Sequence, residues 1–103
     1  MTLREWLHER RPQPPERLLA SIETALGDRL SASASGCGAV CLDAAEVLLR
    51  DLVTRPEMGR DAALDLLTVD ALTTYAFEAA ASDADSLSER ASAAMTRFAG
   101  CLP

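Results

Sequence analysis

Aromatic residues are scarce in this sequence, at 4% of its 103 residues. The core must therefore be built from Leu, Ala and Val, and an Ala- and Leu-rich composition favours helices over strands. Hydrophobic residues still reach 49%, which is too many for a disordered chain. Because no strand-like alternation of apolar and polar residues is present, we expect an all-α fold.

Positive charge is also in short supply. The chain has 10 Lys and Arg residues against 16 Asp and Glu residues, which gives a net charge of −6. An acidic protein repels phosphate backbones and anionic lipid headgroups, so we expect neither nucleic acid nor a membrane as a partner. No apolar run is long enough to span a bilayer. The opening stretch MTLREWLHER lacks the apolar core of a secretory signal, so we expect a cytoplasmic location.

Sequence motifs for catalysis are missing. His8 is the only histidine, and no nucleophile can be placed beside it, so a Ser-His-Asp set cannot be argued. The sequence contains no Gly-rich phosphate loop, no HExxH motif and no Glu-x-x-His di-iron pattern. We therefore expect a protein that is not an enzyme and holds no cofactor.

The cysteines leave three interpretations open. Cys37 and Cys41 are four residues apart at a predicted helix start, and with Cys101 and His8 they could form a Cys3His zinc site. Only one pair of these ligands is close in sequence, so small buried thiols are the simpler interpretation. The helix start could also lower the pKa of Cys37 and make its thiol reactive. An odd number of cysteines fits reduced thiols in the cytoplasm.

Prolines, glycines and capping motifs divide the chain into helices. Thr2 with Glu5, and Ser86 with Glu89, form capping boxes that mark two helix starts. The predicted helices cover about 2–11, 14–26, 39–54 and 57–81, and a last one begins after Ser86. The small and polar segment 28–38 is expected to be a mobile loop. The sequence thus predicts one domain, 1–103, that is a compact bundle of four to five helices around a central hydrophobic helix.

The fourth predicted helix is apolar on every side. In the stretch LLTVDALTTYAF, residues 66–77, the apolar side chains surround the helix axis. A helix of this kind is usually buried all round, either at the centre of a bundle or under a second subunit. We therefore expect both Leu67 and Leu72 to be buried.

Asp70 lies in the middle of this apolar helix. Burying an unpaired carboxylate costs several kcal/mol, so we expect its side chain to have a partner. Within the chain the partner would be a hydroxyl or one of three arginines, Arg50, Arg55 and Arg60. The alternatives are an Arg or Thr of a two-fold related subunit, or a role for Asp70 as an active-site acid. The candidate interface or buried polar residues are Asp70, Thr73, Thr74 and Tyr75.

The stretch LLTVDALTTYAFEAAA, residues 66–81, resembles a helix of the all-α isoprenyl diphosphate synthases. The resemblance implies a core helix in an all-α protein. The aspartate-rich motifs with which those enzymes bind magnesium and diphosphate are absent here, so no catalytic role carries over to any residue.

These observations favour a small non-enzymatic interaction or scaffolding protein that self-associates as a homodimer. The alternative is a small-molecule or metal carrier that uses the interior of the bundle. In that case Asp70, Tyr75 and the cysteines would lie near the ligand.

Overall fold

The chain folds into helices that begin and end close to its prolines and glycines. The computed structural model describes residues 1–56, 59–81 and 87–103. In this part of the chain the elements are α1 (Leu3–His8), α2 (Glu16–Leu26), the 3-10 turn η1 (Gly27–Ser31), α3 (Cys37–Thr54), α4 (Arg60–Ala81) and α5 (Leu87–Ala99). The described residues contain no strand, only an isolated bridge between Thr2 and Ser33. The predicted all-α fold is confirmed.

Local signals fix the helix ends. The amide of Glu5 donates to the Thr2 hydroxyl at 3.2 Å, and the amide of Thr2 donates to the Glu5 carboxylate at 2.8 Å, so the first predicted capping box is confirmed. Gly27 ends α2 with a φ of 55°, a conformation that glycine adopts without strain. The second predicted capping box depends on Ser86, which lies outside the described residues.

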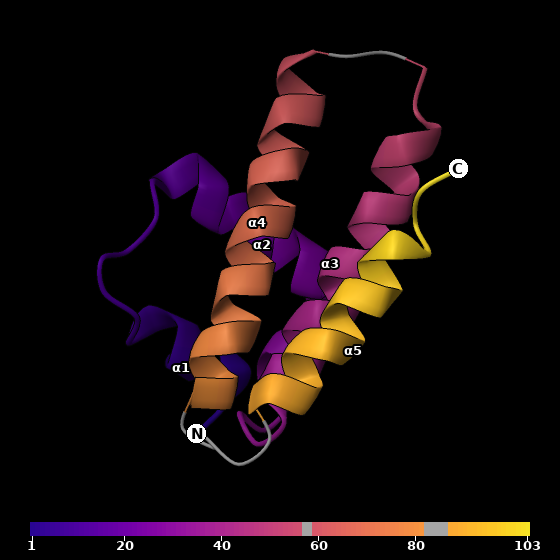
Figure 1. Ribbon diagram of the computed structural model, residues 1–103. Coiled ribbons are helices and arrows are strands. Elements are labelled where there is room, and N and C mark those ends of the chain that lie inside the picture. Colours follow the sequence, from indigo (N-terminus) through magenta and orange to yellow (C-terminus); the bar gives the residue numbers. More distant parts are fainter. Residues whose placement is uncertain (57–58, 82–86) are drawn as a thin grey trace.

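The central pair of the bundle is α3 and α4, which run antiparallel and make the largest contact between elements (Figure 1). Two further helices pack against both members of this pair, α2 on its far side in Figure 1 and α5 on its near side. The short α1 packs against η1. The radius of gyration, 13.5 Å, is that of a compact protein of this length.

The core lies between α1, α2 and the central pair. Its fully buried large side chains are Leu3, Leu7, Ile22, Leu26, Cys41, Thr68 and Leu72. Trp6 packs edge-on against Tyr75, with ring centroids 5.9 Å apart. The guanidinium of Arg10 lies over the Trp6 ring, 4.2 Å from its centroid, as a cation–π partner. Two of the chain's four aromatic residues thus lie where α1 meets α4.

The segment 28–38 is more structured than a loop. Its first residues form η1, and its last two belong to α3, which begins at Cys37 rather than at 39. Between them the chain pairs with the N-terminus, because Ala32 accepts a hydrogen bond from the amide of Leu3 and Ala34 donates one to Met1, both at 2.9 Å. The prediction of an uninterrupted loop is therefore wrong, and the mobility of this segment stays a prediction.

Candidate functional site

α4 has one buried side and one exposed side. The buried side chains form one stripe along the helix: Ala62, Thr68, Val69, Leu72, Tyr75, Ala76 and Ala80. On the opposite side lie five exposed residues, which we call the outer face of α4: Ala63, Leu66, Leu67, Asp70 and Thr74. Leu66 is 58% exposed and Leu67 is 55% exposed. The prediction that α4 is buried all round is therefore wrong for the single chain, as is the predicted burial of Leu67.

Asp70 is exposed rather than buried. Two of the arginines expected to pair with it pair elsewhere: Arg50 binds Glu46, and Arg55 binds Asp51 and Asp65. Asp70 has no ion-pair partner among the described residues. The prediction of a buried acid with a partner in its own chain is wrong, because the stripe of buried residues turns the Asp70 side of α4 to the outside.

The three neighbours of Asp70 do not form one cluster. Thr74 is exposed, and its hydroxyl donates to the carbonyl of Asp70 at 3.0 Å. Thr73 is half-buried and donates in the same way to Val69 at 2.8 Å. Tyr75 is buried on the opposite side of the helix, against Trp6. Asp70, Thr73 and Thr74 therefore belong to the outward side of α4, and Tyr75 belongs to the core.

The buried polar residue of α4 is Thr68, which the sequence analysis missed. Its hydroxyl contacts the hydroxyl of Ser21 at 2.7 Å and donates to the carbonyl of Leu64 at 2.9 Å. A threonine satisfies its polar atom within its own helix, so burial costs it far less than it costs a carboxylate. The signal available in the sequence was its position four residues before Leu72, because residues four apart lie on the same side of a helix.

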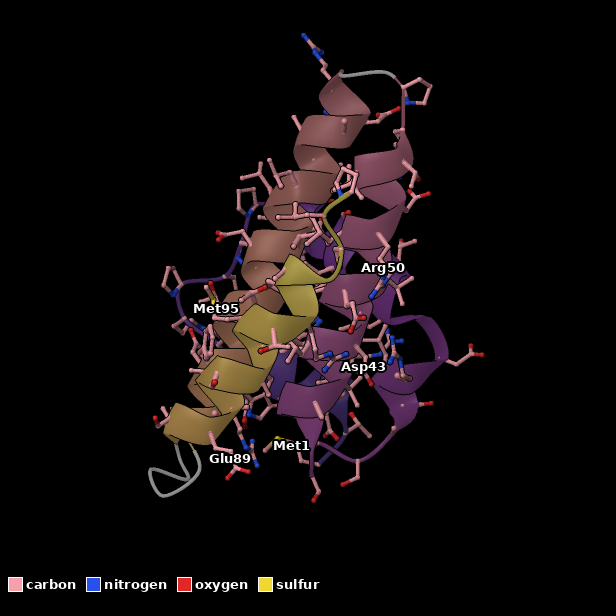
Figure 2. The ribbon with its side chains drawn as sticks, turned by 45° about the vertical axis from the view of Figure 1, so that its right-hand side comes forward. Met1, Asp43, Arg50, Glu89 and Met95 are labelled. Atoms are coloured by element: carbon pink, nitrogen blue, oxygen red, sulfur yellow. The ribbon has the colours of Figure 1, made fainter. Side chains whose placement is uncertain are left out.

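A groove runs between α4 and α5 beside the outer face. It has a volume of about 400 Å³ and is lined by Leu66, Leu67, Val69, Asp70, Thr73 and Phe98. Met95, one turn before Phe98 on α5, is 69% exposed. Figure 2 shows Met95 on one side of α5, with Asp43 and Arg50 on the other side, along α3. The exposed apolar side chains of α4 and α5 thus gather on one side of the bundle.

Charged side chains hold α5 against α3. Arg97 of α5 donates to Glu46 at 2.6 Å and also binds Asp43, while Arg50 binds Glu46 from the same helix at 3.2 Å. Hydrogen bonds from Arg97, and then from Arg50, hold the pKa of Glu46 below its usual value of 4.5. This network fixes one edge of α5 and so fixes the wall that α5 contributes to the groove.

The proposed metal ligands do not come together. Cys37 and Cys41 are buried at the start of α3, Cys101 lies beside the carbonyls of Glu46 and Arg97, and His8 is near Glu23. The described part of the chain holds no group of three or more His, Cys, Asp or Glu side chains that could bind a metal. The weak zinc alternative finds no support in this arrangement.

Burial also disfavours the thiolate form of the cysteines at the start of α3. Burial raises the pKa of Cys37, and it raises the pKa of Cys41 to about 12. The expectation that the helix start lowers the pKa of Cys37 is wrong, because the cost of desolvating a thiolate exceeds the favourable effect of nearby amides. A mechanism in which the Cys37 thiolate is the nucleophile would need a lowered pKa.

Two cavities flank the first turn of α3. One, of about 300 Å³, is shared with α4 and α5, and the other, of about 330 Å³, reaches Trp6 and Arg10; Gly36, Gly38 and Arg90 line both. A side chain at Gly38 would meet the carbonyl of Ala76 at 3.3 Å, so glycine allows the close approach of α3 to α4. Arg10 and Arg90 give this region a positive character, and Glu78 also contributes to its lining.

Comparisons with protein-family models, with curated proteins and with solved structures find no match to this chain. None of the helices in the described part of the chain is long and apolar enough to cross a membrane.

Proposed function

We propose that this chain is a small non-enzymatic helical interaction or scaffolding protein that self-associates as a homodimer. The observation that carries the proposal is the exposure of Leu66 and Leu67 in the lining of the α4–α5 groove, together with exposed Met95 one turn before Phe98, which lines the α5 side. Large apolar side chains scattered singly are ordinary on a protein surface, but a contiguous apolar patch with a polar rim is typical of an interaction site.

The walls of the groove are already held in place in the single chain. α4 is anchored by its buried side, and α5 is held by the ion pairs of Arg97 with Glu46 and Asp43. The α4 wall, held by its buried side, loses little conformational freedom when a partner docks, so more of the interaction energy remains as affinity. The α5 wall depends on these ion pairs and is the less firmly held of the two.

The proposal includes a reducing, cytoplasmic setting. All three cysteines are free and buried, as is common for proteins that fold where thiols stay reduced. Their burial also protects them from forming disulfides between copies of the chain.

The test is sedimentation equilibrium of the wild type and of Leu67→Glu over a wide range of concentrations. We expect the wild type to self-associate, and the Leu67→Glu variant to dissociate about tenfold or more readily, because docking would bury an unpaired carboxylate. The matched control is Val47→Glu, since Val47 is 68% exposed on α3 and lies next to neither wall of the groove.

A wild type that stays monomeric at all concentrations would overturn self-association. Equal effects of Leu67→Glu and Val47→Glu would show that the groove is not the interface. Melting curves of both variants, recorded at concentrations where the wild type is monomeric, test whether unfolding is the cause. We expect both variants to melt close to the wild type there because both positions are exposed.

A further inference from the structure

The outer face of α4, together with exposed Arg60 at the start of the helix, carries a short heptad pattern. Arg60, Ala63, Leu67 and Asp70 are spaced by three, four and three residues, so they form one seam along the helix. All four are exposed. The pattern is apolar in the middle and carries a cation at one end and an acid at the other.

Within the described part of the chain, the two charged ends of the seam are unpaired. Neither Arg60 nor Asp70 has an ion-pair or hydrogen-bond partner for its side chain among the described residues. Their separation of ten positions places these charges roughly 15 Å apart along the helix axis. A matching surface must therefore present an acid and a cation at the same separation and in the opposite order.

A second copy of α4 in antiparallel orientation is such a surface. The spacing places Arg60 and Leu67 at one kind of seam position, a, and Ala63 and Asp70 at the other kind, d. In an antiparallel pair of helices, each a position faces a d position of the second helix. Arg60 then faces Asp70 of the second copy, and Leu67 faces Ala63 of the second copy. The two-fold axis repeats both contacts, so four charged side chains form two ion pairs around an apolar centre.

The geometry points to a specific mode of self-association: we propose that a second copy of this chain docks antiparallel along the outer face of α4, with Arg60 of each chain paired to Asp70 of the other. This inference rests on the proposed homodimer and specifies its pairing. It also gives Asp70 a partner across a two-fold axis.

Charge complementarity selects this occupant and this orientation. A parallel pair would set Arg60 against Arg60 and Asp70 against Asp70, and like charges at an interface are strongly unfavourable. The small side chain of Ala63 leaves room for the larger Leu67 of the second copy, which antiparallel pairing brings opposite to it. Leu66, at the edge of the seam, would extend the contact toward the groove and Phe98 of α5.

The test is a charge swap measured by sedimentation equilibrium. Arg60→Asp alone and Asp70→Arg alone each create like-charge pairs, and we expect either to weaken self-association roughly tenfold or more. The double variant, Arg60→Asp with Asp70→Arg, restores opposite charges and should return to within about threefold of the wild type. An equimolar mixture of the two single variants should form mixed dimers for the same reason.

Two control variants carry the same changes of charge away from the seam. Asp61→Arg lies on α4 outside the seam, and Arg17→Asp lies on α2; both residues are exposed. We expect neither to change the dissociation constant more than about threefold. Recovery in the double variant and in the mixture, with unaffected controls, supports the pairing.

Other outcomes separate the pairing from the proposed function. If Leu67→Glu disrupts the dimer but neither charge reversal does, self-association through the groove holds and the antiparallel pairing is overturned. If the double variant stays as weak as the single variants, the pairing is likewise overturned. If the wild type is monomeric, both proposals fail. Binding of a different protein to the outer face would then indicate a function other than self-association.

Discussion

Leu67 and Leu72 lie five residues apart on α4 in opposite surroundings. Leu72 is fully buried in the core, whereas more than half of Leu67 is exposed. Truncating a buried leucine removes contacts and leaves a cavity, so Leu72→Ala should lower the free energy of unfolding by ~2–5 kcal/mol. Leu67→Ala should lower it by less than about 1 kcal/mol. Urea unfolding at protein concentrations where the chain is monomeric measures both.

Similar losses for the two variants would contradict this difference in burial. A large loss for Leu67→Ala that appears only at high protein concentration would instead be the mark of a dimer, because association adds to apparent stability. The two leucines therefore report separately on the fold and on the interface.

Single-residue predictions from sequence succeeded where the physics is local. The Thr2–Glu5 capping box and the helix stop at Gly27 depend only on nearby backbone, and both are confirmed. The burial of Asp70 depends on which side of α4 faces the core. An apolar pattern on all sides does not carry that information, and Leu66 and Leu67 made the exposed side look like core.

At the scale of elements, α5 depends on charge more than its neighbours do. Among its described side chains only Ala94 is buried, and Arg97 ties the helix to Asp43 and Glu46 of α3. The sequence predicted that α5 would form, but an ion pair between residues about fifty positions apart has no local signature. This ion pair can be predicted only once α3 and α5 are known to lie side by side.

The network makes the docking of α5 sensitive to acid. Because the folded state lowers the pKa of Glu46 below its usual value of 4.5, this carboxylate stabilises the fold fully above that value. The contribution is lost as the pH falls through the lowered pKa. We expect the melting temperature of the wild type to fall more steeply below about pH 4.5 than that of Glu46→Gln.

Melting curves from neutral to acidic pH for both proteins measure this difference. At neutral pH the Glu46→Gln variant should melt below the wild type, and the gap should narrow on acidification. A gap that is constant at every pH would show that the charge of Glu46 does not stabilise the contact of α5 with α3. The Glu89→Gln variant is a suitable control, because Glu89 is exposed on the same helix.

At the scale of the whole molecule, the antiparallel pair of α3 and α4 forms the most extensively packed unit. These two helices make the largest contact in the bundle, and most of the buried residues of the described chain lie on them or pack against them (Figure 1). The composition predicted such a Leu- and Ala-built helical core. It did not predict that α4 would leave one side uncovered, since that depends on how many helices reach it.

Regions with few buried contacts open before the rest of a protein does. We therefore expect amide hydrogen exchange to be slowest in the inner turns of α3 and α4, around Cys41 and Leu72, and faster by about tenfold or more in α5 around Ala94. The measurement is exchange followed by mass spectrometry or NMR on the monomer at neutral pH. In the Arg97→Met variant, which keeps the apolar stem and removes the ion pairs, α5 should exchange faster still while α3 and α4 change little. Protection of α5 equal to that of α3 would mean that the bundle opens as one cooperative unit, and it would rule out the weaker attachment of α5 argued from its contacts.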